Sequence, residues 1–490
     1  MRKLTYIILA ALTLTSCKKW LDVNPQTQIP REELFSSEKG FEEALIGIYT
    51  KCTETDLYGG ELTFGITDVM AQNYAFQNDY LKYAQTAKYD FKYKEIIEKK
   101  DKIWRGLYNG ILNANQILLN IEEKKALFQG KKYALIKGEA LALRAYLHFD
   151  IFRLFGQSTL GGTQKGIPYV TTYSTAPTAI STPDEAMTKM IEDLNAAKLL
   201  LKDADSITTK SYVIGYPNEK GQTETTATSS FLRDRRHRLN YYAVCAQLAR
   251  VYLHKGDKAN ALANATEVIQ SNKFVMADDA GALKEVTPKL KDRILYKELV
   301  FAWYLPQKST WVRDRFQKDN ENLSLSPEFY RTMFETNGVG GEDVRAKEWM
   351  EIIGSTEVEI TKYRRELTTD KDDTTSNLHP LMAPAIRISE LYYIAAECSY
   401  ATSPAQASAY LDYVRFKRSI NQAADISTQD KFYTELLKEA RKEWIGEGQI
   451  FYMYKRLNRN IPGQQGLVTV PSATNWVLPL PADEIQFGGR

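Results

Sequence analysis

Apolar residues recur every three or four positions along much of this chain, which predicts a mainly helical protein. Residues 40–52, 102–121 and 133–155 each carry such a stripe, and Gly156 marks the end of the third. A further helix begins at the sequence TPDE, residues 182–185, which combines a capping box with a proline at the first helical position. The pattern therefore indicates amphipathic helices joined by irregular segments.

Three stretches predict pairs of neighbouring helices, at about residues 102–156, 242–270 and 386–418. In the second stretch, apolar residues at helical spacing lie on both sides of a turn at Gly256-Asp257, close to the tetratricopeptide pattern. Small residues in this pattern allow the two helices of a pair to approach closely. We therefore expect a mainly α-helical scaffold of tetratricopeptide-like helix pairs, with long irregular loops and a few short strands.

Three long segments interrupt the helical pattern, at residues 59–93, 157–181 and 206–230. The first is rich in Gly, Asn, Asp and Tyr, and the last is rich in Thr, Ser and Gly. Long loops on a rigid scaffold often carry function. The first segment is therefore a place to search for a binding site.

The N-terminus has the pattern of an export signal. Arg2 and Lys3 precede an apolar run at residues 4–14, which is shorter than the roughly 20 helical residues needed to cross a bilayer. The run ends in Leu-Thr-Ser before Cys17, and this resembles the lipobox of bacterial lipoproteins. We therefore expect Cys17 to carry acyl chains that anchor the mature protein to a membrane without spanning it. The alternative is an ordinary cleaved signal in which Cys17 is incidental.

The expected organisation is one large domain behind a lipid anchor. We expect residues 1–16 to form a lipoprotein signal peptide and residues 17–30 to form a lipidated tether. Residues 31–490 are expected to form a single domain, with an N-terminal part at 31–230 and a C-terminal part at 231–490. At roughly 150 residues per ordinary core, the length of 490 residues allows about three such cores or one large one.

The composition is typical of a globular protein. Hydrophobic residues make up 43% and charged residues 26%, which excludes a disordered chain and a multi-span membrane protein. The 64 Lys and Arg residues nearly balance the 61 Asp and Glu residues, so the net charge of +3 does not favour nucleic acid binding. Apart from Cys17, the cysteines Cys52, Cys245 and Cys398 are odd in number and far apart, which predicts buried free thiols rather than a disulfide framework.

No motif in the sequence indicates catalysis. The four histidines show no paired metal spacing, and the motifs for nucleotide binding and for a serine nucleophile are missing. Glu439, Glu443 and Glu447 lie on one helix face, and paired acids at a suitable separation could hydrolyse a glycoside. Arginines and lysines nearby in the sequence favour a structural role for this row. We therefore expect no catalytic residue, no metal and no cofactor.

Four arginines form a basic run at the entry to a helix. They are Arg233, Arg235, Arg236 and Arg238. Their position between a polar loop and a helix predicts a solvated surface. In a nearly neutral chain, such a run is weak evidence for nucleic acid binding.

Aromatic residues outside the helical periods point to a ligand. The chain has 30 Tyr, 19 Phe and 7 Trp, and several of these rings interleave with amides and acids in the first long loop and in an irregular segment near residue 303. A pyranose offers apolar C–H faces to such rings and hydroxyls to Asn, Asp and Arg side chains. The candidate ligand-binding residues are Asn73, Tyr74, Phe76, Tyr80, Trp303, Tyr304, Trp311 and Arg313. We expect at least half of the loop rings to pack against the scaffold instead.

Six ordered stretches support a more specific interpretation. They are WLDVNP at 20–25, residues 104–115, 138–156, 387–397 and 441–448, and LPLP at 478–481. Together with the lipobox, these stretches resemble the SusD/RagB family of outer-membrane, nutrient-binding lipoproteins of Gram-negative bacteria. The resemblance spans the mature chain, and it implies a SusD-like fold with a right-handed stack of tetratricopeptide-like helices.

The same resemblance implies a role at the cell surface. It implies a non-enzymatic receptor, anchored by lipid in the outer membrane, that captures oligosaccharide or polysaccharide and delivers it to a SusC-like TonB-dependent transporter. A peptide receptor of the same architecture and, less favoured, an anchored glycosidase remain alternatives. The matched stretches contain no fixed ligand motif, so the candidate binding residues rest on the aromatic pattern alone.

Overall fold

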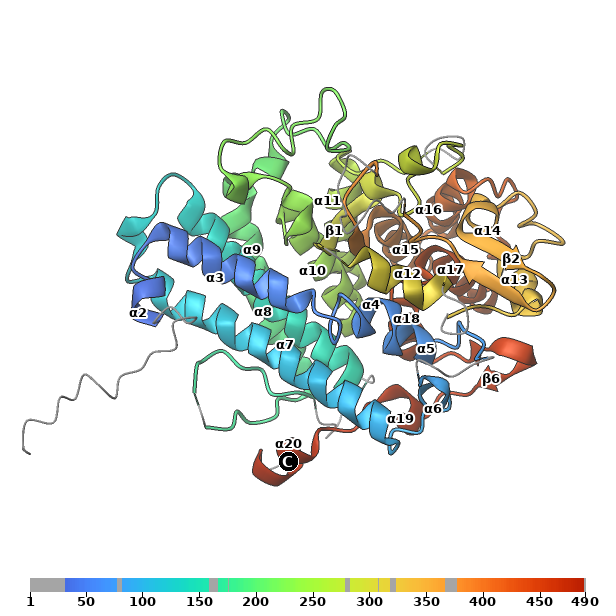
Figure 1. Cartoon of the computed structure of the whole chain (residues 1–490), viewed down its shortest axis with the longest axis horizontal. Helices are drawn as coiled ribbons and strands as arrows, with labels where there is room; N and C mark the ends of the chain where they lie inside the picture. The colour runs from blue at the N-terminus through green and yellow to red at the C-terminus, as the bar shows by residue number, and fades with distance from the viewer. Residues whose placement is uncertain are drawn as a thin grey trace, which may run out of the picture.

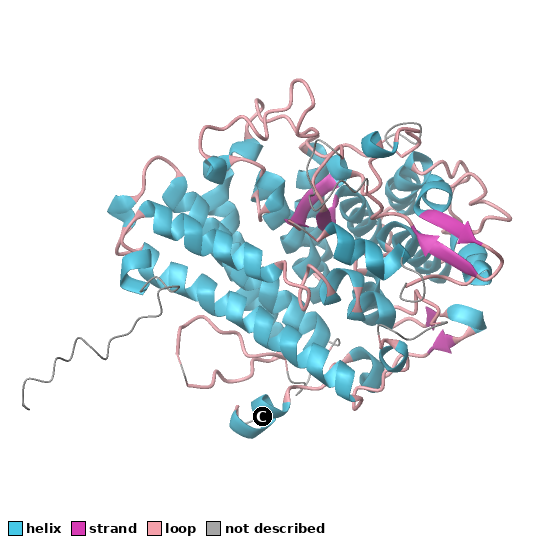
Figure 2. Ribbon diagram, viewed as in Figure 1, coloured by secondary structure: helices cyan, strands magenta, loops and turns pink. Residues whose placement is uncertain are grey.

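The computed structural model describes most of the chain. The described residues are 31–76, 82–157, 166–174, 176–277, 283–306, 308–317, 323–365 and 377–488. The predicted signal peptide and tether, with Cys17, and the candidate residue Tyr80 lie outside the described residues. Within the described ranges the protein is mainly helical, with small two-stranded sheets (Figure 2).

Up to residue 270 the chain forms long helices where the apolar stripes predict them (Figure 1). The long helices are α3 Glu38–Cys52, α7 Lys94–Ile121, α8 Lys132–Phe155, α9 Pro183–Ala204, α10 Tyr241–Lys255 and α11 Lys258–Gln270. The predicted capping box of α9 is present, because the Thr182 hydroxyl accepts from the Glu185 N–H at 3.2 Å and the Glu185 carboxylate accepts from the Thr182 N–H at 2.8 Å. The helices predicted at 40–52, 102–121 and 133–155 are confirmed.

Each expected helix pair consists of two neighbouring helices that pack together. α7 packs against α8, α10 against α11, and α15 Ile388–Ser399 against α16 Pro404–Lys417. Successive pairs are connected, since α9 contacts both α8 and α10, and α15 contacts α11. α8 is buried along most of its length, which explains why its sequence is apolar on every side.

The remaining helices are mostly shorter. In the second half of the chain they are α12 Ser309–Gln317, α13 Pro327–Phe334, α14 Val344–Trp349, α17 Gln429–Trp444 and α18 Ile450–Leu457. Further short helices are α2 Arg31–Leu34, α4 Glu61–Phe64, α5 Ile66–Met70, α6 Ala84–Ala87, α19 Ala473–Trp476 and α20 Ala482–Phe487. Figure 1 shows α15, α16 and α17 side by side, away from the long helices α3 and α7.

The strands form antiparallel pairs. They are β1 Leu299–Tyr304 with β4 Met382–Arg387, β2 Met350–Ile353 with β3 Glu357–Ile360, and β5 Ile461–Pro462 with β6 Val468–Thr469. β1 is buried from Leu299 to Trp303, whereas its last residue, Tyr304, is exposed. The strand therefore carries two adjacent aromatic residues from the core to the surface.

The acidic row belongs to the core, but α17 ends at Trp444, so the prediction that all three acids lie on one helix face is wrong for Glu447, which lies just beyond the helix. Glu439, Glu443 and Glu447 are all buried. Their closest partners include Arg345 at 2.7 Å from Glu439, Arg418 at 2.6 Å from Glu443, and Lys362 at 2.5 Å from Glu447. The contacts therefore give the row a structural role, as expected. Most of the partners come from distant parts of the sequence rather than from nearby residues of the same helix.

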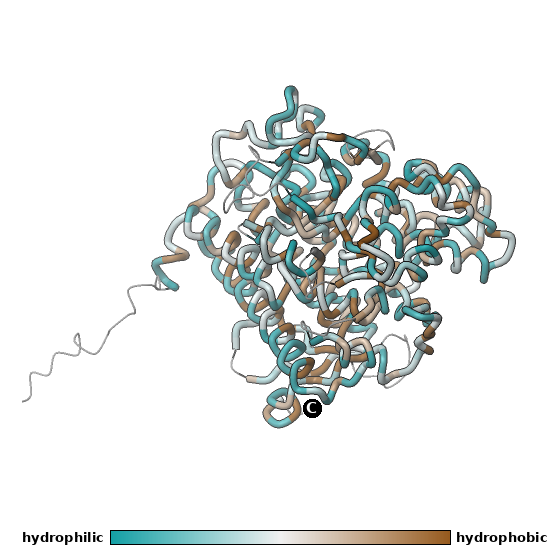
Figure 3. Tube along the Cα trace, turned by 45° about the vertical axis from the view of Figure 1, so that its right-hand side comes forward, coloured by the Kyte–Doolittle hydropathy of each residue, from teal (hydrophilic) through white to brown (hydrophobic). Residues whose placement is uncertain are grey.

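The surface is hydrophilic on the outer loops, and apolar residues gather in the interior (Figure 3). Cys52, Cys245 and Cys398 are buried and free, as predicted. Across the described part of the chain, no helix combines the length and the apolar character needed to cross a membrane.

Candidate functional site

Two candidate residues from the first long loop lie in the protein interior. The Asn73 Oδ1 atom accepts a hydrogen bond from Arg441 Nε at 2.8 Å, and the Tyr74 hydroxyl donates to Asp68 Oδ2 at 2.6 Å. Asp68 also accepts from the Gly446 N–H at 2.6 Å. These contacts attach the loop to the segment that follows α17, so both side chains are engaged by the scaffold.

Two further candidates, Trp311 and Arg313, belong to α12, and a third, Phe76, lies in the first long loop. Phe76 is half-buried, and its neighbour Ala75 pairs with Ser324. The Trp311 ring is covered by the Arg315 guanidinium, whose Cζ atom lies 4.1 Å from the ring centroid. Arg313 is paired with Asp314 at 2.7 Å. All three side chains are partly accessible.

Trp303 and Tyr304 line a cavity at the protein surface, which we call the surface cavity. Its volume is about 350 Å³. The lining residues are Ile46, Tyr49, Thr50, Thr53, Ser230, Phe231, Arg233, Asp234, His237, Arg238, Trp303, Tyr304 and Pro306. Three elements supply them: helix α3, the segment at 230–238 with the short 3₁₀ helices η4 Ser230–Leu232 and η5 Arg235–His237, and the end of β1.

An aromatic wall forms one side of the surface cavity. Trp303 is only 1% exposed, and its ring stacks on Tyr58 with centroids 4.4 Å apart. Tyr304 is 40% exposed and stacks on the imidazole of His237 at 5.4 Å. Burial, together with the charges of two neighbouring arginines, lowers the pKa of His237 to about 3, so this ring is neutral. The stacked pair therefore presents an uncharged ring face at the cavity, which suits the C–H face of a sugar.

The prediction that the basic run is a solvated surface is wrong for three of its four arginines. Arg235 is fully buried, where it pairs with Asp205 at 2.8 Å and with Glu139 at 2.7 Å. Arg236 is buried as well and pairs with Glu224 at 2.6 Å. Carboxylates from distant segments compensate these two charges, which allows the run to fold into the protein.

The polar wall of the surface cavity comes from the rest of this run. Arg233 is exposed and donates from Nε to the Ala227 carbonyl at 2.6 Å. Asp234 has a left-handed backbone with a φ of 48°. Burial and the charge of Glu224 raise the pKa of the Asp234 carboxyl to about 6. With the hydroxyls of nearby Ser and Thr residues, these groups offer the donors and acceptors that hydroxyl-rich ligands need.

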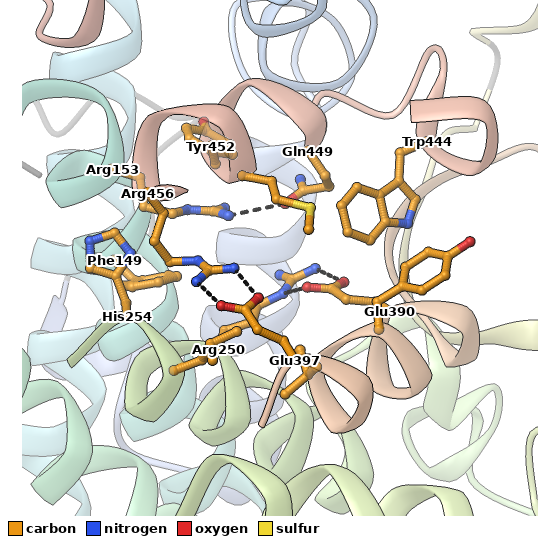
Figure 4. A pocket seen from close by; sticks show the side chains of 14 residues that line it. Phe149, Arg153, Arg250, His254, Glu390, Glu397, Trp444, Gln449, Tyr452 and Arg456 are labelled. Carbon is orange, nitrogen blue, oxygen red and sulfur yellow. Dashed lines mark hydrogen bonds and ion pairs between the residues drawn. The ribbon is translucent and has the colours of Figure 1, made fainter. Parts of the chain in front are cut away.

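A second cavity, which we call the interior cavity, lies between α8, α10, α15 and α18 (Figure 4). Its volume is about 60 Å³. Arg250 forms a two-point pair with Glu390 at 2.6 and 2.5 Å, and Arg456 forms a two-point pair with Glu397 at 2.6 Å in both contacts. Arg153 also lines it and donates to Gln449 Oε1 at 3.1 Å.

The charges around the interior cavity compensate one another. Besides the two pairs, Arg153 is paired with the buried carboxylate of Asp150. Burial and neighbouring cations lower the pKa of His254 to about 3, so this lining residue is neutral. The small volume and the matched charges indicate that the ion pairs around the interior cavity join the helices and that the cavity does not bind a ligand.

Comparison with protein families identifies the chain. A family model described as "Starch-binding associating with outer membrane" matches residues 19–213, and a model of the SusD family matches residues 331–483. Together the two matches cover more than two thirds of the chain. The chain therefore belongs to the SusD/RagB family. No curated protein sequence matches it.

Solved structures share the fold over nearly the whole chain. A SusD superfamily protein from Bacteroides thetaiotaomicron VPI-5482 is 22% identical, with a TM-score of 0.68, and the match covers 92% of this chain and 98% of that chain. A SusD-like carbohydrate binding protein from Bacteroides vulgatus ATCC 8482 is 17% identical, with a TM-score of 0.70 and 92% and 97% coverage. The surface glycan-binding protein A of Bacteroides thetaiotaomicron, in complex with laminarihexaose, is 14% identical, with a TM-score of 0.62 and 92% and 98% coverage. At these identities the likeness shows the SusD-like fold.

Sequence reasoning did not identify most of the surface cavity. It selected Trp303 and Tyr304, but it missed His237, Asp234 and the contribution of α3. The alternation of charged residues with one histidine at 233–238 is the available signal, but from the sequence it fits a solvated face equally well, because the buried carboxylates opposite it are distant in sequence.

Proposed function

We propose that this protein is a non-enzymatic, glycan-binding lipoprotein of the outer membrane, and that sugar binds in the surface cavity. The observation that carries this proposal is the exposed ring of Tyr304, stacked on neutral His237 beside the polar side chains of Arg233 and Asp234. A ring face with hydrogen-bonding groups beside it matches the two kinds of surface on a pyranose. The glycan class is supported by the family description of starch binding and by the laminarihexaose complex of a structural neighbour.

Truncation of Tyr304 tests the site. A glycan array identifies a ligand, and calorimetry then compares wild-type protein with Tyr304→Ala. We expect a loss of about 1 to 3 kcal/mol in binding free energy, because the open aromatic face is removed while the core stays intact. Tyr93→Ala is the matched control, since Tyr93 is 43% exposed and lies outside the cavity. Wild-type affinity in the Tyr304 variant would place the glycan site elsewhere.

The remaining candidate residues from the sequence define a second test. Phe76, Tyr80, Trp311 and Arg313 remain predicted ligand contacts, and Trp311→Ala measured on the same glycan shows whether they extend the site. A loss of affinity with unchanged circular dichroism would add the α12 region to the glycan surface. Unchanged affinity would limit binding to the surface cavity.

The cellular role proposed for the protein is capture and delivery of glycan. We propose that Cys17 carries the lipid anchor and that the partner is a SusC-like TonB-dependent transporter. Cys17→Ser should release the protein from membrane fractions, because the described helices include none that could span a bilayer. Co-purification of the transporter with the wild-type protein from solubilised outer membranes tests the partnership.

Two alternatives are separated by direct assays. A peptide receptor of the same architecture would bind a peptide array rather than a glycan array. An anchored glycosidase would release reducing ends from the glycan that it binds, whereas the proposed receptor returns the glycan unchanged.

A further inference from the structure

The surface cavity contains an arginine whose charge is incompletely compensated. Arg238 lines the cavity and is 4% exposed, and its Cζ atom lies 4.2 Å from the centroid of the Phe231 ring. Its Nη2 atom donates to the Phe231 carbonyl, while Nη1 is shielded from solvent and has no hydrogen-bond partner among the described residues. The nearest carboxylate oxygen is Glu139 Oε1, 3.7 Å from Nη1.

Glu139 is engaged by other groups. Its Oε1 atom lies 2.7 Å from Arg235 Nη1, and its Oε2 atom accepts from the Tyr49 hydroxyl at 2.9 Å. One carboxylate is thus shared between two buried guanidiniums. Burial lowers the pKa of Arg238, and the attraction of Glu139 does not offset this loss of hydration together with the repulsion from Arg235. An additional anionic partner would therefore stabilise this buried guanidinium, because its charge is poorly hydrated and only partly compensated.

The rim of the cavity carries a second positive charge. Arg233 has no ion pair with any described residue, and it is exposed beside the cavity. Among the described lining residues the carboxylate is Asp234, so two guanidiniums face one carboxylate. The carboxylates that compensate Arg235 and Arg236 lie behind the wall, in the core. The walls of the cavity therefore carry more positive than negative charge on the side that a ligand would contact.

We propose that the surface cavity binds a saccharide that carries an anionic group, a carboxylate or a sulfate ester, and that the exposed guanidinium of Arg233 and the charge of Arg238 in the cavity wall attract this group. The inference rests on the proposed glycan-binding function and specifies its substrate class. At the rim, the Arg233 guanidinium can donate hydrogen bonds to a carboxylate or a sulfate, and Arg238 adds a positive charge that its neighbours only partly compensate. The ring of the saccharide then lies against Tyr304, on the aromatic side of the same cavity.

An array of neutral, uronate-containing and sulfated glycans tests the class, with calorimetry on matched probes. One pair of probes is tri-galacturonate and its methyl ester, and the other is a sulfated galactan oligosaccharide and its desulfated form. We expect the charged member of at least one pair to bind about tenfold more tightly than its neutral match at low salt. Rising salt should reduce this preference, because screening weakens the charge interaction and leaves the ring contact unchanged.

Substitution of Arg238 assigns the preference to this residue. Arg238→Gln should bring the charged and neutral probes to within about twofold of each other, Arg238→Lys should restore part of the preference, and Arg105→Gln, an exposed arginine outside the cavity, should leave it unchanged. If Arg238→Gln does not fold, the salt dependence of the wild-type preference is the deciding measurement.

The outcomes separate this inference from the function on which it rests. Tight binding of neutral glycans, sensitive to Tyr304→Ala and with no preference for charged probes, overturns the anionic class and leaves glycan binding in place. Binding of no saccharide on the array overturns both. A charged-probe preference that survives in folded Arg238→Gln overturns the assignment to Arg238.

Discussion

The two arginine-lined cavities of this protein differ in how their charges are balanced. Around the interior cavity, Arg250 and Arg456 each have a carboxylate of their own, held by two contacts (Figure 4). Around the surface cavity, Arg238 shares Glu139 with Arg235, and Arg233 has no carboxylate partner among the described residues. Arginine thus stabilises the fold where a carboxylate of its own compensates its charge, and an arginine without such a carboxylate can attract a ligand.

The largest effect should come from breaking a matched pair in the interior cavity. Glu390→Ala leaves Arg250 buried without its two-point partner, and we expect a loss of about 3 to 5 kcal/mol in the free energy of unfolding. Urea denaturation followed by circular dichroism measures it. Glu342→Ala, which removes an exposed partner of Lys347, is the control and should leave stability unchanged. Equal stability of the two variants would show that the interior pairs are not structural.

A smaller effect is expected from acid, in both cavities. His254 and His237 are neutral in the folded protein, with pKa values lowered to about 3 by burial. In the unfolded chain each histidine takes up a proton below about pH 6.5, so the unfolded state gains stability as the pH falls from 6.5 toward 3. Each histidine should therefore cost up to about 1.4 kcal/mol of stability per pH unit in this window.

The measurement is denaturant unfolding at several pH values. His254→Gln and His237→Gln should each make the acid dependence shallower, and the variant of His254 should not alter glycan affinity. A slope that neither substitution changes would contradict the neutral state of these rings.

The smallest effect concerns glycan affinity and pH. Asp234 faces Glu224 and the guanidiniums of Arg233, Arg236 and Arg238, and its pKa is raised to about 6. Above pH 6 its ionised carboxylate repels an anionic ligand, and below pH 6 the neutral acid does not. The affinity for a sulfated probe, which stays ionised, should therefore rise about threefold as the pH falls from 7.5 to 5. Calorimetry at both pH values measures the change.

Asp234→Asn is the matched variant for this prediction. It should bind the sulfated probe equally well at both pH values, at the higher affinity. The desulfated probe should show no pH dependence with either protein. A lower affinity of the wild-type protein for the sulfated probe at pH 5 than at pH 7.5 would contradict the proposed positive charge of the cavity.

Much of the scaffold could be predicted from local sequence. The stripe at 40–52 and the capping box at 182–185 predict α3 and the start of α9, because helical periodicity and N-terminal caps depend on residues within a few positions of one another. The structural role of Glu439, Glu443 and Glu447 could also be predicted, although their partners could not. Local patterns specify which face of a helix is buried, but not which charge lies opposite it.

The candidate site depended on contacts between distant residues. From the sequence, Trp303 and Tyr304 are equivalent aromatic candidates, but β1 ends between core and surface, so that Trp303 is buried against Tyr58 whereas Tyr304 is 40% exposed. In the same way, the run at 233–238 shows four similar arginines, and burial against carboxylates from other segments distinguishes them. Burial and charge compensation depend on the whole set of neighbours in space, so tertiary structure decided which of these residues support the fold and which face a ligand.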